Sequence, residues 1–152
     1  MIRIFSVSNQ PELKTAIMDY VVKSWKEIAE FFFEQLEQSM LPEEDIQDTF
    51  VMVDDDRIVG FYQFLRNEPI RNLESTPWIS SIFIDEDYRG SRLSELFLIH
   101  GRIRAGKLGF REVFISTDQI NLFEKFGFTE IGLDIDKWGF PTKIYVANAL
   151  QM

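Results

Sequence analysis

The sequence contains no cysteine and a single histidine, His100, among its 152 residues. Without cysteine the chain can form no disulfide framework, no thiolate zinc site and no cysteinyl acyl-enzyme. A single imidazole also excludes a metal site built from several histidines, although sites made of carboxylates stay open. We therefore expect no metal, and no chemistry that proceeds through a thioester on the protein.

Basic residues are scarce: 16 Lys and Arg oppose 25 Asp and Glu, which gives a formal charge of −9. Residues 1–57 carry a net charge of −8, and residues 58–152 carry −1. Nucleic-acid binders show the opposite sign because they neutralise phosphates, so we expect no nucleic-acid partner. The acidic first third either attracts a small cationic molecule or serves solubility alone.

Long apolar runs are also missing, since a run such as Phe31–Phe33 is far shorter than a bilayer span. Residues Met1–Ser6 lack the basic and apolar regions of a secretory signal. We therefore expect a cytoplasmic protein with no membrane partner. A chain of 17.9 kDa with 45% hydrophobic residues is long enough to bury one core, and we expect a single domain over residues 1–152.

The spacing of apolar residues predicts the secondary structure of the first half. Apolar side chains recur at helical spacing from Leu13 onward, and the helix must end before Pro42, which disfavours helical backbone in the residue ahead of it. The predicted elements are strand 2–6, a helix in one or two segments ending near Ser39, strand 49–53, a turn at 54–57 and strand 58–64.

The second half alternates strands and helices. The predicted elements are strand 78–84, a helix from about Leu93 to near Gly109, strand 112–116, a short helix around 119–125, strand 129–135 and strand 143–146. An early hairpin followed by a strand–helix–strand unit indicates an α+β domain with one mixed sheet.

The segment after strand 78–84 could bind an anion. A strand that feeds a tight turn and a helix start leaves several backbone N–H groups free at one place, with the helix dipole behind them. Gly90 allows close approach of the backbone, and Arg89, Arg92, Ser91 and Ser94 could add donors. Taken alone, the same pattern also fits a capped helix with two surface arginines.

Three blocks of this sequence resemble the GNAT family of N-acetyltransferases. Ile82-Phe83-Ile84 followed by Asp85 to Leu93 is similar to the family's acetyl-CoA signature, in which Arg/Gln-x-x-Gly-x-Gly/Ala follows strand four. Residues 118–128 are similar to the late block ending in Tyr-Glu-Lys-x-Gly-Phe. Thr76-Pro77-Trp78-Ile79 resembles a Thr-Pro-Trp-Leu segment of one bacterial subgroup.

The resemblance implies a mixed, mostly antiparallel sheet of six to seven strands flanked by about four helices. It implies transfer of an acetyl group from acetyl-CoA, as co-substrate, to the amine of a small molecule or peptide by direct attack in a ternary complex. Because many relatives form dimers, it also suggests a homodimer. The residues that it assigns to CoA binding are Ile82, Phe83, Ile84, Arg89, Gly90, Ser91, Arg92, Leu93, Ser94 and Phe123.

The chain departs from the family pattern at functional positions. Arg92 stands where the first motif glycine belongs, which is acceptable if the backbone there is right-handed and needs no positive φ. Phe123 stands where many members carry the tyrosine that protonates the leaving thiolate, and phenylalanine donates no proton. The glutamate that serves as base in histone-type members falls near Trp78 here, so no orthodox base is visible.

Other residues could fill these roles, and each also has a structural explanation. Tyr62 and Ser81 are the catalytic candidates. The structural alternative for Tyr62 is packing on a strand face, and the alternative for Ser81 is that its hydroxyl has no role. The loop carboxylates Glu74 and Asp118 have weaker claims, and His100 fits a helix stripe. The candidates to line the acceptor pocket are Trp25, Phe32, Trp78, Ser80 and Trp138. The alternative explanation for them is ordinary core packing.

Three functions therefore compete. The first is an acetyl-CoA-dependent N-acetyltransferase. The second is a non-catalytic acyl-CoA-binding or interaction module on the same fold, which Phe123 and the altered motif favour. The third is a phosphate-ligand-binding domain unrelated to CoA.

Overall fold

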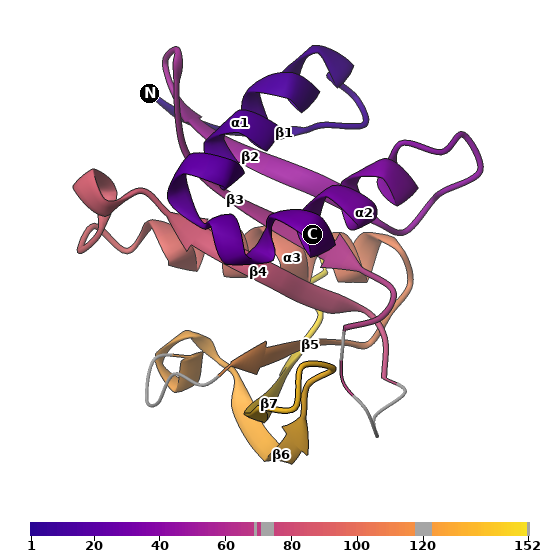
Figure 1. The fold of residues 1–152 in the computed structure, drawn as a ribbon. Helices are drawn as coiled ribbons and strands as arrows, with labels where there is room; N and C mark the ends of the chain where they lie inside the picture. The colour runs from indigo at the N-terminus through magenta and orange to yellow at the C-terminus, as the bar shows by residue number, and fades with distance from the viewer. Residues whose placement is uncertain (69, 71–74, 118–122, 152) are drawn as a thin grey trace. The chain divides into compact units, whose positions relative to one another are not determined.

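The computed structural model describes residues 1–68, 70, 75–117 and 123–151. The chain divides into two compact units. Unit 1 comprises Met1–Phe64 and Ser81–Ser94, and unit 2 comprises Leu65–Ser80 and Glu95–Met152. Seven strands are hydrogen-bonded in the order β1-β2-β3-β4-β5-β7-β6, labelled in Figure 1, and of the pairs whose register is given only β4–β5 is parallel. This confirms the predicted α+β class with a mixed, mostly antiparallel sheet.

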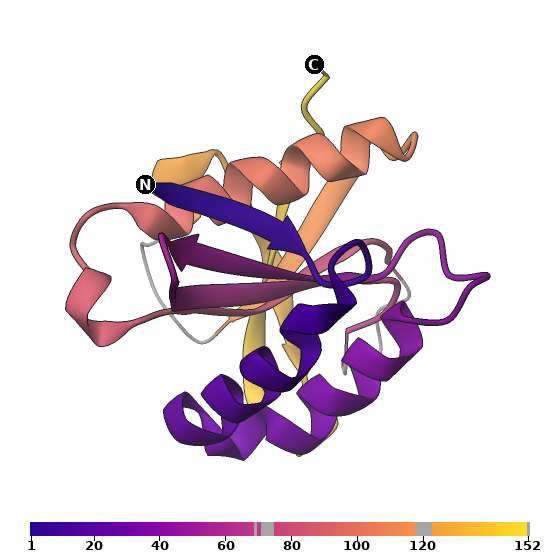
Figure 2. The same ribbon diagram turned by 90° about the horizontal axis from the view of Figure 1, so that it is seen from above.

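Unit 1 is built on the antiparallel strands β1 (Ile2–Ser6), β2 (Asp48–Asp54) and β3 (Arg57–Leu65). Helices α1 (Lys14–Ser24) and α2 (Ala29–Ser39) lie together on one side of these strands, as Figure 2 shows. Apolar side chains of the helices and strands meet in one buried cluster that comprises Val7, Ile17, Val21, Phe32, Leu36, Val51, Val53 and Phe61.

The predicted helix consists of two segments because the backbone turns at Trp25, whose φ of −151° and ψ of 65° are not helical. Short 3₁₀ turns flank the first segment, η1 (Pro11–Leu13) before it and η2 (Lys26–Ile28) after it. The second segment ends at Ser39, as predicted from Pro42. The turn predicted at 54–57 is also present, with Asp55 at a φ of +55° between paired Asp54 and Arg57.

Unit 2 contains β5 (Glu112–Thr117), β6 (Thr129–Ile135), β7 (Pro141–Asn148) and most of α3 (Leu93–Lys107). Strand β7 runs antiparallel to both β5 and β6. Helix α3 is followed by Gly109 at a φ of +89°, where the N–H of Phe110 returns to the carbonyl of Ala105. A glycine in the left-handed conformation just past a helix end is the expected stop signal.

Strand β4 (Trp78–Ile84) has the predicted bounds, and its residues are shared between the two units. In unit 2 its register with β5 joins Trp78 to Phe114, and the N–H of Phe114 bonds the carbonyl of Pro77. Of the short helix expected around 119–125, residues 119–122 lie outside the described residues, and the residues that follow form the 3₁₀ turn η4 (Phe123–Phe126). In addition, η3 (Glu86–Tyr88) follows β4.

Strand β6 exposes its apolar side chains. Leu133 is 71% exposed, and Ile131 and Ile135 are also exposed, whereas Gly132 and Asp134 between them are half-buried. This inverts the usual pattern, in which the apolar residues of a half-buried strand face the core. Among the described residues, no helix has the length and apolar character needed to cross a membrane.

Candidate active site

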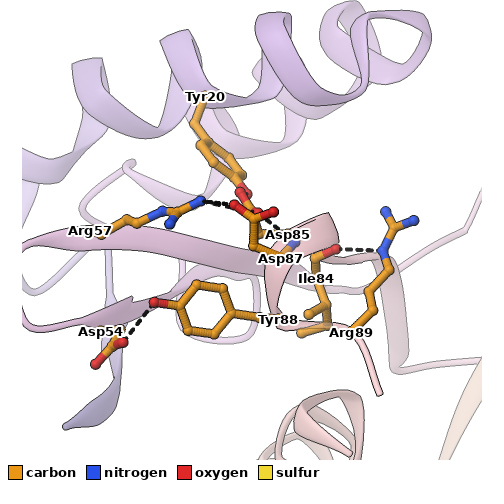
Figure 3. Close-up of polar contacts among 8 residues, drawn as sticks. All are labelled: Tyr20, Asp54, Arg57, Ile84, Asp85, Asp87, Tyr88 and Arg89. Atoms are coloured by element: carbon orange, nitrogen blue, oxygen red, sulfur yellow. Dashed lines mark hydrogen bonds and ion pairs between the residues drawn. The ribbon is translucent and has the colours of Figure 1, made fainter. Parts of the chain in front are cut away.

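The segment between β4 and α3 forms a compact loop in unit 1, drawn in Figure 3. The Asp85 carboxylate accepts a bond of 3.1 Å from the N–H of Asp87 and so caps η3. Gly90 follows with a φ of +89° and open space beside its Cα, so that an added Cβ would have no atom within 4 Å. A ligand can therefore approach the backbone closely at Gly90, and the positive φ explains why glycine is required there.

The backbone at Arg92 decides whether the motif glycine could be replaced there. The sequence analysis made the replacement acceptable only if this backbone is right-handed. Its φ is instead +61°, in the left-handed region, immediately before α3 begins at Leu93. The position therefore does favour glycine, and arginine occupies it under backbone strain.

Asp85 anchors the loop to the rest of unit 1 (Figure 3). The hydroxyl of Tyr20 on α1 donates to its carboxylate at 2.7 Å, and Nη2 of Arg57 lies 3.3 Å from it and 2.9 Å from the carboxylate of Asp87. The Tyr20 bond, aided by Arg57, lowers the pKa of Asp85, while burial and the same bond raise the pKa of Tyr20. These contacts hold the loop in place before any ligand binds.

A second set of contacts fixes Tyr88 at the end of η3. Its hydroxyl donates to Asp54 at 2.7 Å, which lowers the pKa of that carboxyl, and its ring lies 5.3 Å from the Arg57 guanidinium carbon. The loop is thus attached to α1, to the start of β3 and to the end of β2.

Arg89 folds back on the strand that precedes it. Its Nε donates to the carbonyl of Ile84 at 2.9 Å, and its guanidinium carbon lies 5.3 Å from the ring centre of Phe83. The Ile84 carbonyl, assigned by resemblance to a ligand contact, therefore already accepts one hydrogen bond. The outer nitrogens of Arg89 extend past this contact in Figure 3.

The other loop residues assigned to CoA binding lie along the same segment. Ser91 is exposed and donates to the carbonyl of Tyr88 at 3.1 Å, while Leu93 and Ser94 are half-buried in the first turn of α3. Ile82 is half-buried on β4, and the Phe83 ring stacks on Phe61 at 5.2 Å. Phe83 is thus mainly a packing residue of unit 1.

A half-buried glutamate, Glu68, places its carboxyl group in unit 2 between β4 and β5. Glu68, in the segment after β3, accepts a bond of 2.7 Å from the Ser80 hydroxyl at Oε1 and one of 3.2 Å from the Ser116 hydroxyl at Oε2. Burial raises the pKa of Glu68 from 4.5 to about 7, and the two hydroxyls limit the rise.

The two catalytic candidates differ in environment. Tyr62 on β3 is fully buried and stacks on Phe50 at 5.1 Å. Ser81 on β4 has a φ of +54°, which is uncommon for a residue other than glycine and locally distorts the strand. The loop carboxylates Glu74 and Asp118 lie outside the described residues.

The candidate pocket residues of unit 1 pack inside it. Phe32 is completely buried in the apolar cluster and meets Phe61 edge to face at 5.0 Å. Trp25 is half-buried and lies 6.2 Å from the Phe83 ring. Phe32 therefore presents no surface to a substrate, whereas Trp25 retains some.

Of the three candidate pocket residues of unit 2, two are buried and one is exposed. Trp78 is buried against Phe114 at 5.4 Å, and its Nε1 donates to the carbonyl of Ser75. Ser80 is buried and bonded to Glu68. Trp138 is 52% exposed, with the Lys137 ammonium 5.0 Å from its ring centre.

Phe123 is only 7% exposed and lies among aromatic rings. Its ring is 6.2 Å from Phe128 and 5.9 Å from Tyr145, whose hydroxyl donates to Glu124 at 2.9 Å. Burial and this bond raise the pKa of Tyr145 to about 12. Phe123 therefore has an apolar packing role in unit 2.

The sequence did not identify Glu68, Tyr20 or Arg57 as site residues. Tyr20 lies in the apolar stripe of a helix, and Arg57 lies in a hairpin turn, so both fit ordinary structural roles. Glu68 lies in a segment with no periodic pattern between two predicted strands. The one available signal was a pair of serines. Ser80 stands two residues beyond Trp78 and Ser116 two residues beyond Phe114, on neighbouring strands.

The family profile described as Acetyltransferase (GNAT) family matches residues 13–128. No curated protein sequence matches the chain. Among solved structures it is similar to aminoglycoside 6'-acetyltransferase type Ii, with 18% identity, a TM-score of 0.71 and coverage of 99% of this chain and 97% of the other.

Two further aminoglycoside 6'-N-acetyltransferase structures are similar over the same shares of both chains, 99% and 97%. The one complexed with coenzyme A has 16% identity and a TM-score of 0.71. The one from Enterococcus faecium has 17% identity and a TM-score of 0.71. At this identity the structures establish the shared fold.

Proposed function

Because the chain belongs to the GNAT family of acetyltransferases, we propose that it transfers an acetyl group from acetyl-CoA to the amine of a small molecule or peptide by direct attack. In this proposal residues 1–152 act as one N-acetyltransferase domain. A direct attack requires no cysteine nucleophile, in agreement with a sequence that has none.

The observation that carries the proposal is the loop after β4. Backbone N–H groups at residues 89–94 precede and open α3, a helix of 15 residues, and the left-handed Gly90 leaves room for a diphosphate against the main chain. The exposed arginines 89 and 92 add positive charge there. Ile82 and Ile84 are the residues that would contact pantetheine along β4.

The acceptor that we favour is a small cationic amine. The chain has a formal charge of −9, concentrated in residues 1–57, which attracts cations over a distance. Similar folds are found in proteins named for acetylation of aminoglycosides, which are polyamines. Within the described residues, no group of three His, Asp or Glu side chains is placed to bind a metal, and the proposed reaction uses none.

Calorimetry with CoA and release of free thiol from acetyl-CoA test the proposal. Kanamycin, spermidine and phenylalaninamide serve as acceptor probes. We expect heat on CoA addition, and thiol release that depends on an added amine. Absence of CoA binding would refute the proposal, while CoA binding without turnover of any amine would favour the non-catalytic module.

Two matched glycine variants test the position of the cofactor loop. Gly90 and Gly109 share a φ of +89° and open surroundings, so Gly90→Ala and Gly109→Ala should lower stability by a similar amount, roughly 1–2 kcal/mol. Only Gly90→Ala should weaken CoA binding, because only Gly90 lies in the loop. Equal CoA affinities of the two variants would place the diphosphate elsewhere.

A further inference from the structure

The loop after β4 carries more acids than bases, although the proposed ligand is a diphosphate. Within residues 85–94 the acids are Asp85, Glu86 and Asp87, and the bases are Arg89 and Arg92. Glu86 and Asp87 are exposed. Because like charges repel, uncompensated carboxylates in this loop oppose the approach of an anion. A further cation beside these acids would therefore favour phosphate binding.

Arg57 supplies such a cation from the start of β3. Its Nη2 lies 2.9 Å from Oδ2 of Asp87 and 3.3 Å from Oδ1 of Asp85, so one guanidinium bridges two carboxylates (Figure 3). In the described part of the chain, no other cationic side chain lies within ion-pair distance of either acid. The cation–π contact with the Tyr88 ring helps to hold the guanidinium in this place.

The backbone brings Arg57 to the loop. The N–H of Asp85, the residue after β4, donates to the carbonyl of Val59 at 2.7 Å, two residues beyond Arg57 on β3. Arg57 and the whole loop as far as Ser94 belong to unit 1. The bridge between the guanidinium and the two carboxylates therefore lies within one compact unit.

The attachment of the loop does not depend on Arg57 alone. The Tyr20 hydroxyl donates to the Asp85 carboxylate, and the Tyr88 hydroxyl donates to the carboxylate at the end of β2, both at 2.7 Å. These bonds, and the backbone bond between Asp85 and β3, remain when the guanidinium is removed. Their donors are neutral, so the contribution that is specific to Arg57 is its positive charge.

We infer that Arg57 sets the CoA affinity of the loop by neutralising the carboxylates of Asp85 and Asp87. It acts through these two acids and is thus a positioning residue for the cofactor. The inference rests on the proposed function. A guanidinium suits this role because it stays charged at every physiological pH and presents several donors in a fixed plane, which allows it to bridge two carboxylates.

Calorimetry with CoA on the full chain tests the role of the charge. Arg57→Gln should weaken CoA binding roughly 3- to 10-fold at low ionic strength, and Arg57→Lys, which keeps the charge, should recover most of the loss. The difference between wild type and Arg57→Gln should shrink at high salt, because salt screens exposed charges. A difference that is the same at low and high salt would contradict the inference.

Arg111→Gln is the matched control for the change in net charge. Arg111 is an exposed arginine of unit 2, just before β5, and its substitution removes one positive charge away from the bridge. Arg111→Gln should bind CoA like wild type. If Arg57→Gln binds CoA as tightly as Arg111→Gln at low salt, Arg57 does not set the affinity.

A double substitution separates neutralisation from anchoring of the loop. Asp87→Asn in the Arg57→Gln background removes one carboxylate together with the cation that neutralised it. If charge is decisive, the double variant should bind CoA within about twofold of wild type. If the bridge only anchors the loop, the double variant should stay as weak as Arg57→Gln, since it lacks the bridge as well. That second result would overturn the inference.

Asp87→Asn by itself keeps the test decisive if Arg57→Gln does not fold. It leaves Arg57 with one carboxylate fewer to neutralise, so it should bind CoA at least as tightly as wild type, and weaker binding would refute neutralisation. The wild-type titration keeps this inference apart from the proposed function. A wild type that binds no CoA refutes both, whereas a wild type that binds CoA no better than Arg57→Gln refutes the inference alone.

Discussion

Replacing Arg92 by glycine should stabilise the protein. Arg92 has a φ of +61° and an exposed side chain at the start of α3. A left-handed conformation costs a residue with a Cβ roughly 1–2 kcal/mol, and glycine escapes this cost. Glycine also gives the unfolded chain more conformational entropy, which lowers the free energy of unfolding by about 0.5–1 kcal/mol and offsets part of this gain. The net expected gain in the free energy of unfolding is therefore about 0.5–1 kcal/mol.

Arg92→Ala is the control that separates backbone strain from side-chain contacts. Alanine removes the guanidinium and its interactions but keeps the Cβ and hence the strain. The comparison of Arg92→Gly with Arg92→Ala, by urea unfolding and thermal melting, isolates the effect of φ. For a chain of this size, we expect a difference in Tm of about 2–3 °C in favour of glycine.

CoA affinity adds a second readout to the same pair. A relaxed loop needs less reorganisation on binding, so Arg92→Gly should bind CoA more tightly than Arg92→Ala. Both variants lack the arginine charge, which makes the comparison independent of electrostatic attraction. An Arg92→Gly variant that is less stable than Arg92→Ala would refute the left-handed backbone and with it the argument from strain.

Two further substitutions test other contacts. Tyr20→Phe removes the hydrogen bond to Asp85 and should cost about 1 kcal/mol at pH 7, less than for a buried charge because Asp85 is partly exposed. That bond lowers the pKa of Asp85, so its contribution to the free energy of unfolding is present above the ordinary carboxyl pKa and is lost as the pH falls through the lowered pKa. Urea unfolding at neutral and at strongly acidic pH should therefore show that the stability difference between Tyr20→Phe and wild type vanishes in acid. Gly127→Ala should lower Tm more than Gly109→Ala, because both glycines have a φ of +89° but a Cβ at Gly127 would lie 2.9 Å from Nη1 of Arg102. Equal melting temperatures would mean that Arg102 moves aside freely, despite its bonds to the carbonyls of Asn148 and Phe126.

Most of the fold follows from local patterns in the sequence. The run Trp78–Ile84 has the bounds of β4, since its apolar content and the flanking turn residues limit it on both sides. The helical spacing of apolar residues across Trp25 was consistent with either one or two helical segments. The break is a single non-helical residue, and no proline or glycine marks it in the sequence. The strand order, in contrast, depends on pairing between distant segments.

The site was less predictable because its chemistry depends on tertiary contacts. Gly90 could be inferred from the resemblance, but the positive φ of Arg92 could not, since arginine gives no sign of left-handed backbone. Glu68 acquires its character from burial and from two serines 12 and 48 residues away in sequence. Charge and periodicity alone describe the same residue as an ordinary loop glutamate.

The inverted pattern of β6 has a consequence for local stability. With Leu133 and its apolar neighbours turned outward, the strand gains little from solvent exclusion and depends on its backbone bonds to β7 and on the ion pair between Glu130 and Lys143. Such a strand should detach from its neighbour at a lower free energy than the global unfolding of the chain. Amide protons of β6 would then exchange with solvent well before those of β2 and β3, whose side chains are almost all enclosed.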